Sequence, residues 1–126
     1  MQKITIDGVE YSLTPIKKTE PIIAPIIIEQ HLKFEVYPED LGEHTWKDAK
    51  KVCKELGNGW RLPTREELHL MWLNRDTIGG FAAAYYWSSS KYNFYTVWSQ
   101  SFSVGNQNVY EKDYPGYVRA VRDIKK

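Results

Sequence analysis

The strong helix signals of this chain fall between residues 45 and 73, and their position constrains the fold more than any other feature. The first helix is predicted to follow Thr45, with Asp48 three residues later as a capping-box variant, and to end at Gly57. The second follows Thr64, and Glu67 completes its capping box. Both segments repeat apolar residues at helical spacing: Trp46, Ala49, Val52, Cys53 and Leu56, then Leu68, Met71 and Trp72. Two helices that precede a strand-rich second half are typical of an α+β fold.

Strand signals lie on both sides of the helices. Apolar residues alternate around Asp7-Gly8, the strongest short signal for a β-hairpin. Residues 21–29 are predicted to form either an edge strand broken at Pro25 or an arm that pairs with a neighbouring subunit in a homo-oligomer. We therefore divide the chain into a hairpin and arm over residues 1–30 and a main domain over residues 31–126. In the main domain the sequence predicts a loop over Asp76–Phe81 and strands over Leu32–Tyr37, Tyr85–Ser89, Val97–Ser103, Asn108–Tyr110 and Tyr117–Val121.

Composition argues against several classes of protein. Lys and Arg number 17 against 16 Asp and Glu, and the two kinds are mixed along the chain, so we expect no nucleic-acid partner. The longest apolar run, residues 21–28, is too short to span a bilayer, so we expect no membrane insertion. The N-terminus lacks the apolar segment of a signal peptide. The single cysteine, Cys53, excludes an internal disulfide.

The C-terminal third combines aromatic rings with small polar side chains. Eleven of the 18 aromatic residues lie between Tyr85 and Tyr117, and the stretch Tyr92–Tyr110 carries no charge. Antibody paratopes have this composition, because tyrosine gives rigid contact area while serine and asparagine give adaptable hydrogen bonds. The predicted ligand-binding residues are Tyr92, Asn93, Phe94, Tyr95, Ser99, Ser101, Asn106, Asn108, Tyr110, Asp113, Tyr114 and Tyr117.

Strand alternation divides these residues between two faces. Trp98, Gln100 and Phe102 are expected to face the scaffold, and Ser99, Ser101 and Ser103 are expected to face the ligand. Trp87 and Trp98 are predicted to pack, because rings beside small residues usually fill sheet faces. Four tyrosines with polar or turn-forming neighbours are predicted to be exposed: Tyr92, Tyr95, Tyr110 and Tyr114.

Three motifs occur in a fixed order: GWRLPTREEL at residues 59–68, YWSSS at 86–90 and YVRAVR at 117–122. Over Phe34–Arg122 the chain thereby resembles C-type-lectin-like domains of bacteria and phages, on the branch shared with the formylglycine-generating enzymes. The variable proteins of diversity-generating retroelements, which include phage receptor-binding proteins, are the most similar group. The resemblance implies two helices packed on a small twisted antiparallel sheet, with a ligand-facing surface on the C-terminal strands. It also implies non-enzymatic binding of a protein ligand, on a phage virion or bacterial cell surface.

The resemblance further implies that part of the surface is diversified. Mutation of template adenines in AAY codons yields NNY codons, which cannot encode Trp, Gln, Lys, Glu or Met. The residues that this rule assigns to the framework are Trp98, Gln100, Gln107, Glu111 and Lys112. The residues compatible with NNY codons are Tyr92, Asn93, Phe94, Tyr95, Ser99, Ser101, Val104, Asn106, Asn108, Tyr110, Asp113, Tyr114 and Pro115.

Other functions find less support in the sequence. The alternatives are a carbohydrate-binding or adhesin module of fixed specificity and a degenerate enzyme relative. The WND strand of calcium-dependent lectins is replaced here by YWSSS and VWSQS, and Cys53 lies on the first helix, away from the late catalytic cysteines of the enzyme branch. The three histidines lack metal-ligand spacing, so we expect neither a metal nor a cofactor. Either Arg119 or Arg122 is expected to point inward and pair with Glu66 or Glu67 in the first turn of the second helix.

Overall fold

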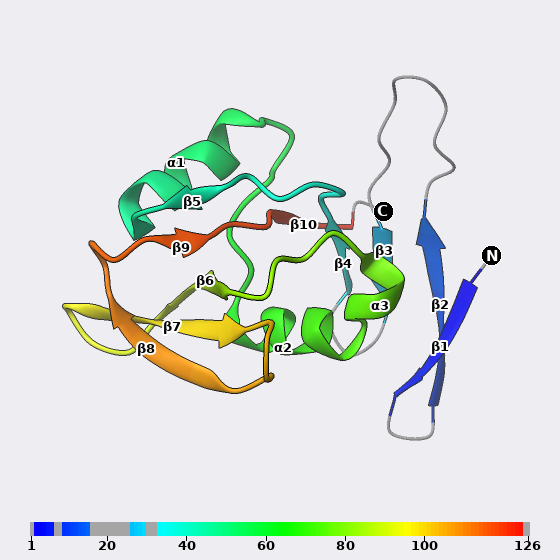
Figure 1. The fold of residues 1–126 in the computed structure, drawn as a ribbon. Coiled ribbons are helices and arrows are strands. Elements are labelled where there is room, and N and C mark those ends of the chain that lie inside the picture. The colour runs from blue at the N-terminus through cyan, green and yellow to red at the C-terminus, as the bar shows by residue number, and fades with distance from the viewer. Residues whose placement is uncertain (1, 7–8, 16–25, 30–32, 125–126) are drawn as a thin grey trace.

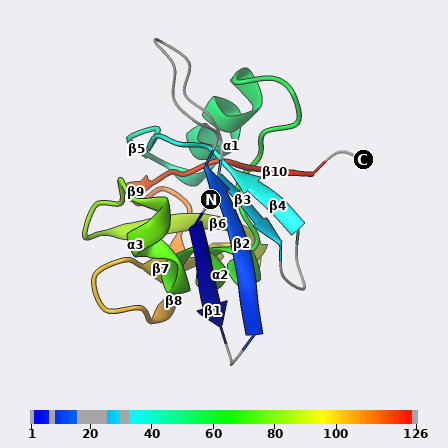
Figure 2. The same ribbon diagram turned by 90° about the vertical axis from the view of Figure 1, so that its right-hand side faces the viewer.

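The computed structural model describes residues 2–6, 9–15, 26–29 and 33–124, which form two five-stranded sheets and three helices. Figures 1 and 2 show this arrangement from two sides. The first sheet has the order β1 (Gln2–Ile6), β2 (Val9–Pro15), β3 (Ile26–Glu29), β4 (Lys33–Val36), β10 (Val121–Asp123). The second has the order β5 (Glu43–His44), β9 (Gly116–Tyr117), β6 (Tyr85–Lys91), β7 (Thr96–Ser101), β8 (Gln107–Glu111). The helices are α1 (Trp46–Glu55), α2 (Arg65–Leu73) and α3 (Arg75–Ile78), so the α+β prediction is confirmed.

The N-terminal hairpin is present as predicted. β1 and β2 pair antiparallel with Ile6 opposite Val9, so only residues 7 and 8, which lie outside the described residues, connect them. The edge-strand prediction is wrong for residues 26–29, because β3 is hydrogen-bonded to β2 on one side and to β4 on the other. These four residues therefore have no free edge for a neighbouring subunit. Residues 16–25, the rest of the predicted arm, lie outside the described residues.

The C-terminal segment joins the two sheets. The single strand predicted over Tyr117–Val121 is two strands: β9 pairs with β5 in the second sheet, and β10 pairs with β4 in the first. Between them the backbone still bonds to the chain before α1, since the Leu41 and Tyr37 N–H groups donate to the carbonyls of Val118 and Ala120. The predicted strand ends early because the chain leaves one sheet to enter the other.

Both helices begin where their caps predict. The Thr45 side chain accepts from the Asp48 N–H, and at Thr64 both halves of the capping box with Glu67 are formed. The prediction of a loop after α2 is wrong in part, because residues 75–78 form the short helix α3 before the chain reaches Gly79. In the described part of the chain, no helix has the length and apolar content to cross a membrane.

The core has two clusters, one for each long helix. α2 packs with β4, β6 and β10 through Phe34, Leu68, Met71, Tyr86 and Val121. α1 packs on the opposite side of β6 and β7 through Trp46, Ala49, Cys53, Trp87 and Val97. The second sheet therefore lies between the two helices. The C-terminal end of β8 and the turn between β6 and β7 lie at the end of the domain away from the N-terminal hairpin (Figure 1).

The predicted ion pair between the C-terminal segment and α2 is wrong in its partners. Arg119 does point inward and is fully buried, but its guanidinium pairs with Asp40 at 3.0 Å and donates to the carbonyls of Tyr37 and Gly79. Arg122 pairs with Glu35 on the neighbouring strand. The Glu67 carboxylate is held instead by Arg61, at 2.8 and 2.9 Å, and by the N–H of Thr64. Glu66 is exposed.

Candidate ligand-binding surface

The two faces of the second sheet divide as the alternation predicts. Trp98 and Gln100 face α2, where the Arg65 guanidinium lies 3.5 Å from the Trp98 ring centroid. Arg65 also donates to Gln107, which donates in turn to Gln100, so a polar chain fixes α2 to the strands. The opposite face carries Ser99, which lies across from Trp87 on β6 and Asn108 on β8. The scaffold face is thus confirmed.

Two of the three serines predicted to face the ligand are buried instead. Ser99 and Ser101 are each only 2 % exposed. Ser99 lies at the floor of a hollow, and the Ser101 hydroxyl accepts from the N–H groups of Ser103 and Val104, which closes the turn after β7. Ser103 is exposed. The side chains of small residues do not rise above the rings beside them, so alternation alone places them on the correct face without exposing them.

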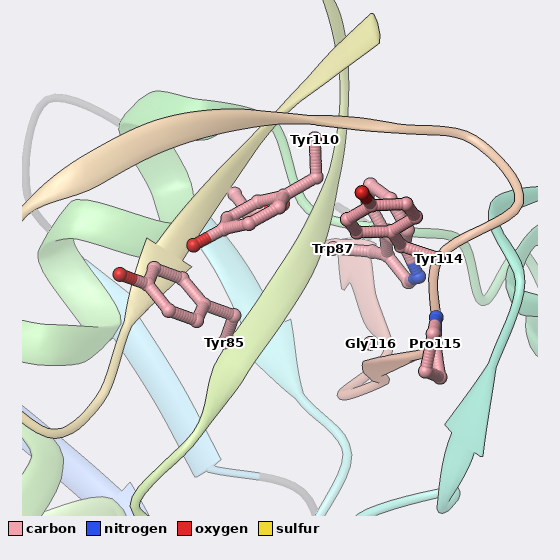
Figure 3. Close-up of a pocket in the computed structure, with 7 residues that line it drawn as sticks. Tyr85, Trp87, Tyr110, Tyr114, Pro115 and Gly116 are labelled. Atoms are coloured by element: carbon pink, nitrogen blue, oxygen red, sulfur yellow. The ribbon is translucent and has the colours of Figure 1, made fainter.

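A small hollow opens on this face, with a volume of about 60 Å³. Its lining comes from β6, β7, β8 and the segment that follows β8: Tyr85, Trp87, Ser99, Tyr110, Tyr114, Pro115 and Gly116. Figure 3 shows the Tyr110 hydroxyl pointing toward Tyr85, and the ring of Tyr114 beside Trp87. The Tyr110 ring centroid lies 4.7 Å from that of Tyr85 and 6.2 Å from that of Tyr114. Typical small-molecule pockets measure roughly 300–1,000 Å³, so this hollow suits a side chain or a few waters.

Two of the three phenols of the hollow, those of Tyr85 and Tyr110, have pKa values shifted in opposite directions. Burial, followed by the neighbouring Tyr85, raises the pKa of Tyr110 to about 12. Hydrogen bonding from Tyr110 and then from Asn108 lowers the pKa of Tyr85, and Asn106 acts in the same direction. The hydroxyl of Tyr110, which points toward Tyr85 in Figure 3, therefore loses its proton less readily than an ordinary phenol. Three predicted ligand-binding residues, Asn106, Asn108 and Tyr110, thus lie around Tyr85. Tyr85 itself was predicted to lie on a strand and was not among the predicted ligand-binding residues.

A second, wider hollow has a volume of about 300 Å³, and its residues Glu111 and Asp113 are next in the chain to Tyr110 and Tyr114 of the first. It is lined by Phe94 and Tyr95 from the turn between β6 and β7 and by Glu111, Lys112 and Asp113 at the end of β8. Phe94 is 77 % exposed, Tyr95 is 70 % exposed, and Tyr114, next to Asp113, is 50 % exposed. The prediction of exposure is confirmed for Tyr95 and Tyr114, whereas Tyr110 is half-buried. We refer to Tyr85, Phe94, Tyr95, Tyr110 and Tyr114 together as the aromatic surface.

Two residues of the turn between β6 and β7 do not belong to this surface. The Asn93 side-chain oxygen accepts from the N–H groups of Tyr95 and Thr96, at 2.9 and 2.8 Å, and from the Thr96 hydroxyl at 2.8 Å. Its side chain therefore holds the turn. Tyr92 is exposed, but its ring meets Trp98 edge-on at 5.5 Å, on the side of the sheet that faces α2.

The prediction of Tyr117 as a ligand-binding residue is wrong, because Tyr117 lies on the face of the sheet opposite the small hollow. β9 has only two residues, and Gly116 is the one that faces the small hollow, close against Trp87. Tyr117 points the other way and packs against the cluster around α2, with its ring centroid 5.6 Å from that of Tyr86. Tyr85 takes its place in the hollow. Alternation in YYWSSS carries that signal, since Tyr85 must share a face with Trp87.

Neither Cys53 nor the described histidines show features of a reactive site. Cys53 is buried on α1, and burial raises the pKa of its thiol to about 12, so it stays protonated near neutral pH. The His44 ring is hydrogen-bonded to the Leu41 carbonyl at 2.7 Å. Within residues 33–124 and the three described N-terminal strands, no group of three His, Cys, Asp or Glu residues is placed to hold a metal. The geometry of the aromatic surface suits binding through ring contacts and hydroxyl or amide hydrogen bonds.

The comparison with protein families agrees with the motifs. Residues 20–122 match the model of the Lcl C-terminal domain, a C-type-lectin-like family associated with variable proteins of diversity-generating retroelements. The match ends at Arg122, as the resemblance does, but begins before Phe34 and so includes β3. No curated protein matches the chain.

Proposed function

Because the chain belongs to the Lcl C-terminal domain family, we propose that it is a non-enzymatic ligand-binding domain that meets a protein on a cell surface through its aromatic surface. The observation that carries this proposal is the exposure of Phe94, Tyr95 and Tyr114 around the two hollows. Soluble domains rarely leave contiguous apolar surface uncovered unless it binds a partner. Tyrosine is also among the residues that most often dominate binding energy at protein interfaces.

The shape of the surface favours a protein ligand. One hollow is small and the other is wide and open, so neither encloses a small molecule as typical cofactor sites do. Exposed rings around a shallow depression match a protein interface, in which a few aromatic anchors fill pockets and polar groups surround them.

A fixed-specificity carbohydrate-binding or adhesin module is the second candidate. The phenol of Tyr85 with the amides of Asn106 and Asn108 offers a cluster of donors and acceptors that suits sugar hydroxyls. Calcium would not be expected to assist, since the WND strand of calcium-dependent lectins is replaced here by YWSSS and VWSQS, and only two carboxylates, those of Glu111 and Asp113, line the wider hollow.

We further propose that the surface is diversified and displayed on a phage virion or bacterial cell surface. Residues compatible with NNY codons are mostly exposed, among them Phe94, Val104 and Asn106, whereas the framework residue Gln100 is fully buried. A reverse transcriptase gene nearby, with a near-copy of the last coding segment that differs at adenines, would support diversification. A neighbourhood without either would count against it.

The function is tested by binding of the fluorescently labelled domain to a panel of bacterial strains. Replacing Tyr95 and Tyr114 by alanine should weaken binding by roughly 30-fold or more, because truncation of one such aromatic anchor costs about 2 kcal/mol. Leu73→Ala is the matched control, since Leu73 is an exposed apolar residue at the end of α2.

The treatment of the cells separates the two candidate functions. Protease treatment should abolish binding if the ligand is a protein. Binding that survives protease, is lost on glycosidase treatment and is indifferent to the tyrosine variants would overturn the proposal of a protein ligand at this surface.

A further inference from the structure

Three lysines from different elements converge on one indole ring. The ammonium nitrogens of Lys50 on α1, Lys112 after β8 and Lys91 at the end of β6 lie 3.7, 5.1 and 5.9 Å from the Trp46 ring centroid. Trp46 is itself only 5 % exposed and is fixed by a hydrogen bond from its indole nitrogen to the Ser88 carbonyl, at 2.9 Å. The lysines are therefore gathered around a rigid support. We call them the lysine cluster.

The positive charge of the lysine cluster is not neutralised within the described chain. Ion pairs among residues 33–124 use Arg61, Arg119 and Arg122, and none uses a lysine of the cluster. Burial, followed by repulsion from Lys91 and Lys112, lowers the pKa of Lys50. Like charges that lie close together repel even in water, and an anion placed between them would offset that repulsion.

The lysine cluster is continuous with the aromatic surface. Lys112 lines the wider hollow together with Tyr95, and its ammonium nitrogen lies 5.1 Å from the ring centroid of Phe94. A ligand that covers Phe94 and Tyr95 would therefore also meet the lysines. Their sequence separation hides this, because Lys50, Lys91 and Lys112 are mixed with acidic residues along the chain and meet only in the fold.

We propose that the lysine cluster binds carboxylates of an acidic segment in the protein ligand, beside the contact made by the aromatic surface. The inference rests on the proposed function and specifies the chemistry of the partner. An acidic segment would satisfy the lysines with aspartate or glutamate while its apolar residues cover Phe94 and Tyr95.

The charges at the rim favour a protein segment over a uniformly charged polymer. Glu111 and Asp113 line the same hollow as Lys112, on either side of it in the chain. A sulfated glycan or a nucleic acid carries negative charge along its whole length and would be repelled by these carboxylates. A protein segment can place its carboxylates at the lysines alone and apolar or basic residues opposite Glu111 and Asp113.

The test uses three probes of defined chemistry: a peptide in which glutamates are separated by leucine and lysine, heparin and a single-stranded oligothymidine. Each is labelled and titrated with the full chain at low ionic strength by fluorescence anisotropy. The Lys50→Gln, Lys91→Gln, Lys112→Gln triple variant should bind the glutamate peptide about tenfold more weakly than the natural chain, since each exposed ion pair contributes a modest amount. The matched control replaces Lys33, Lys47 and Lys51 by glutamine, which removes the same net charge from exposed positions that are not among the lysines near the Trp46 ring.

The outcomes separate this inference from the proposed function. Loss with the cluster variant, little loss with the control and weakening by added salt support the inference. Equal loss with both triple variants, no binding of the glutamate peptide, or tighter binding of heparin or oligothymidine at the same lysines overturns it. In each of those cases the proposed function still stands if Tyr95→Ala and Tyr114→Ala weaken cell binding. If they do not, the function fails whatever the lysines bind.

Discussion

Replacing Arg119 by methionine should destabilise the domain more than any other single loss of charge in its described part. The guanidinium is fully buried and donates to Asp40, at 3.0 Å, and to the carbonyls of Tyr37 and Gly79, at 2.6 and 2.9 Å. Burial lowers the pKa of Arg119, and the neighbouring Asp40 acts to raise it. The guanidinium has therefore lost its hydration in the folded protein, and its hydrogen bonds offset that cost. Methionine fills much of the same volume but leaves three acceptors without their donor.

The magnitude follows from this geometry. Removal of one partner of a buried ion pair costs about 3–5 kcal/mol, because the other charge stays buried without compensation. The side chain of Asp40 is 19 % exposed and keeps its bond from the Tyr86 hydroxyl, so we place the loss near the lower end of that range. For a domain of this size the melting temperature should fall by roughly 10–20 °C. Urea denaturation followed by tryptophan fluorescence measures the free energy directly.

Two further variants make the test decisive. Arg122→Met breaks a comparable pair with Glu35, but the side chain of Arg122 is 25 % exposed and water can replace part of the lost contact, so its cost should be about 1 kcal/mol. Arg119→Lys keeps the positive charge but loses the planar guanidinium that donates to several acceptors at once. Its loss of stability should fall between the losses of the two methionine variants. A loss for Arg119→Met that is below 1 kcal/mol, or equal to that for Arg122→Met, would refute the reasoning.

Two other predictions concern the hollow and alkaline pH. A methyl group on Gly116 would lie 2.7 Å from the Trp87 indole nitrogen, so Gly116→Ala should cost about 1–3 kcal/mol in urea denaturation, and an unchanged midpoint would contradict the packing. Burial raises the pKa of Tyr86 above its usual range and that of Cys53 to about 12. The unfolded chain releases these protons near pH 8.5–10, so stability should be complete at pH 8 and fall as the pH rises toward 11. Tyr86→Phe should show a shallower fall across the same series of urea midpoints, and an equally steep one would show that Tyr86 does not contribute.

The fold was predictable where local chemistry determines it. Thr64 and Glu67 determine where α2 begins because the capping box involves only neighbours in the chain. The partner of Arg119 was not predictable in the same way, since Asp40 lies 79 residues earlier and several carboxylates were equally plausible partners. The division of Tyr117–Val121 into two strands likewise depends on which sheets lie nearby, and the sequence does not contain that information locally.

The residue types of the candidate site and the face of the sheet that carries them were predictable from the sequence. How deeply each side chain is buried was less predictable. Alternation placed Ser99 on the correct side, but its burial depends on Trp87 and Tyr110, which come from other strands. The prediction for Tyr117 was wrong because β9 has only two residues and Gly116 occupies the position that faces the small hollow. The lysine cluster escaped prediction because its members are far apart in sequence.

The hydrogen bonds of Asn93 have a consequence for how this domain can evolve. The turn that carries Tyr92, Phe94 and Tyr95 is closed by one amide oxygen and the backbone, and by none of the three rings. These closing hydrogen bonds do not depend on what the rings are, so substitutions of Phe94 and Tyr95 can change the chemistry offered to a partner while the bonds remain. Position 93 lacks that freedom, because only a short side chain with an acceptor oxygen can close the turn in the same way.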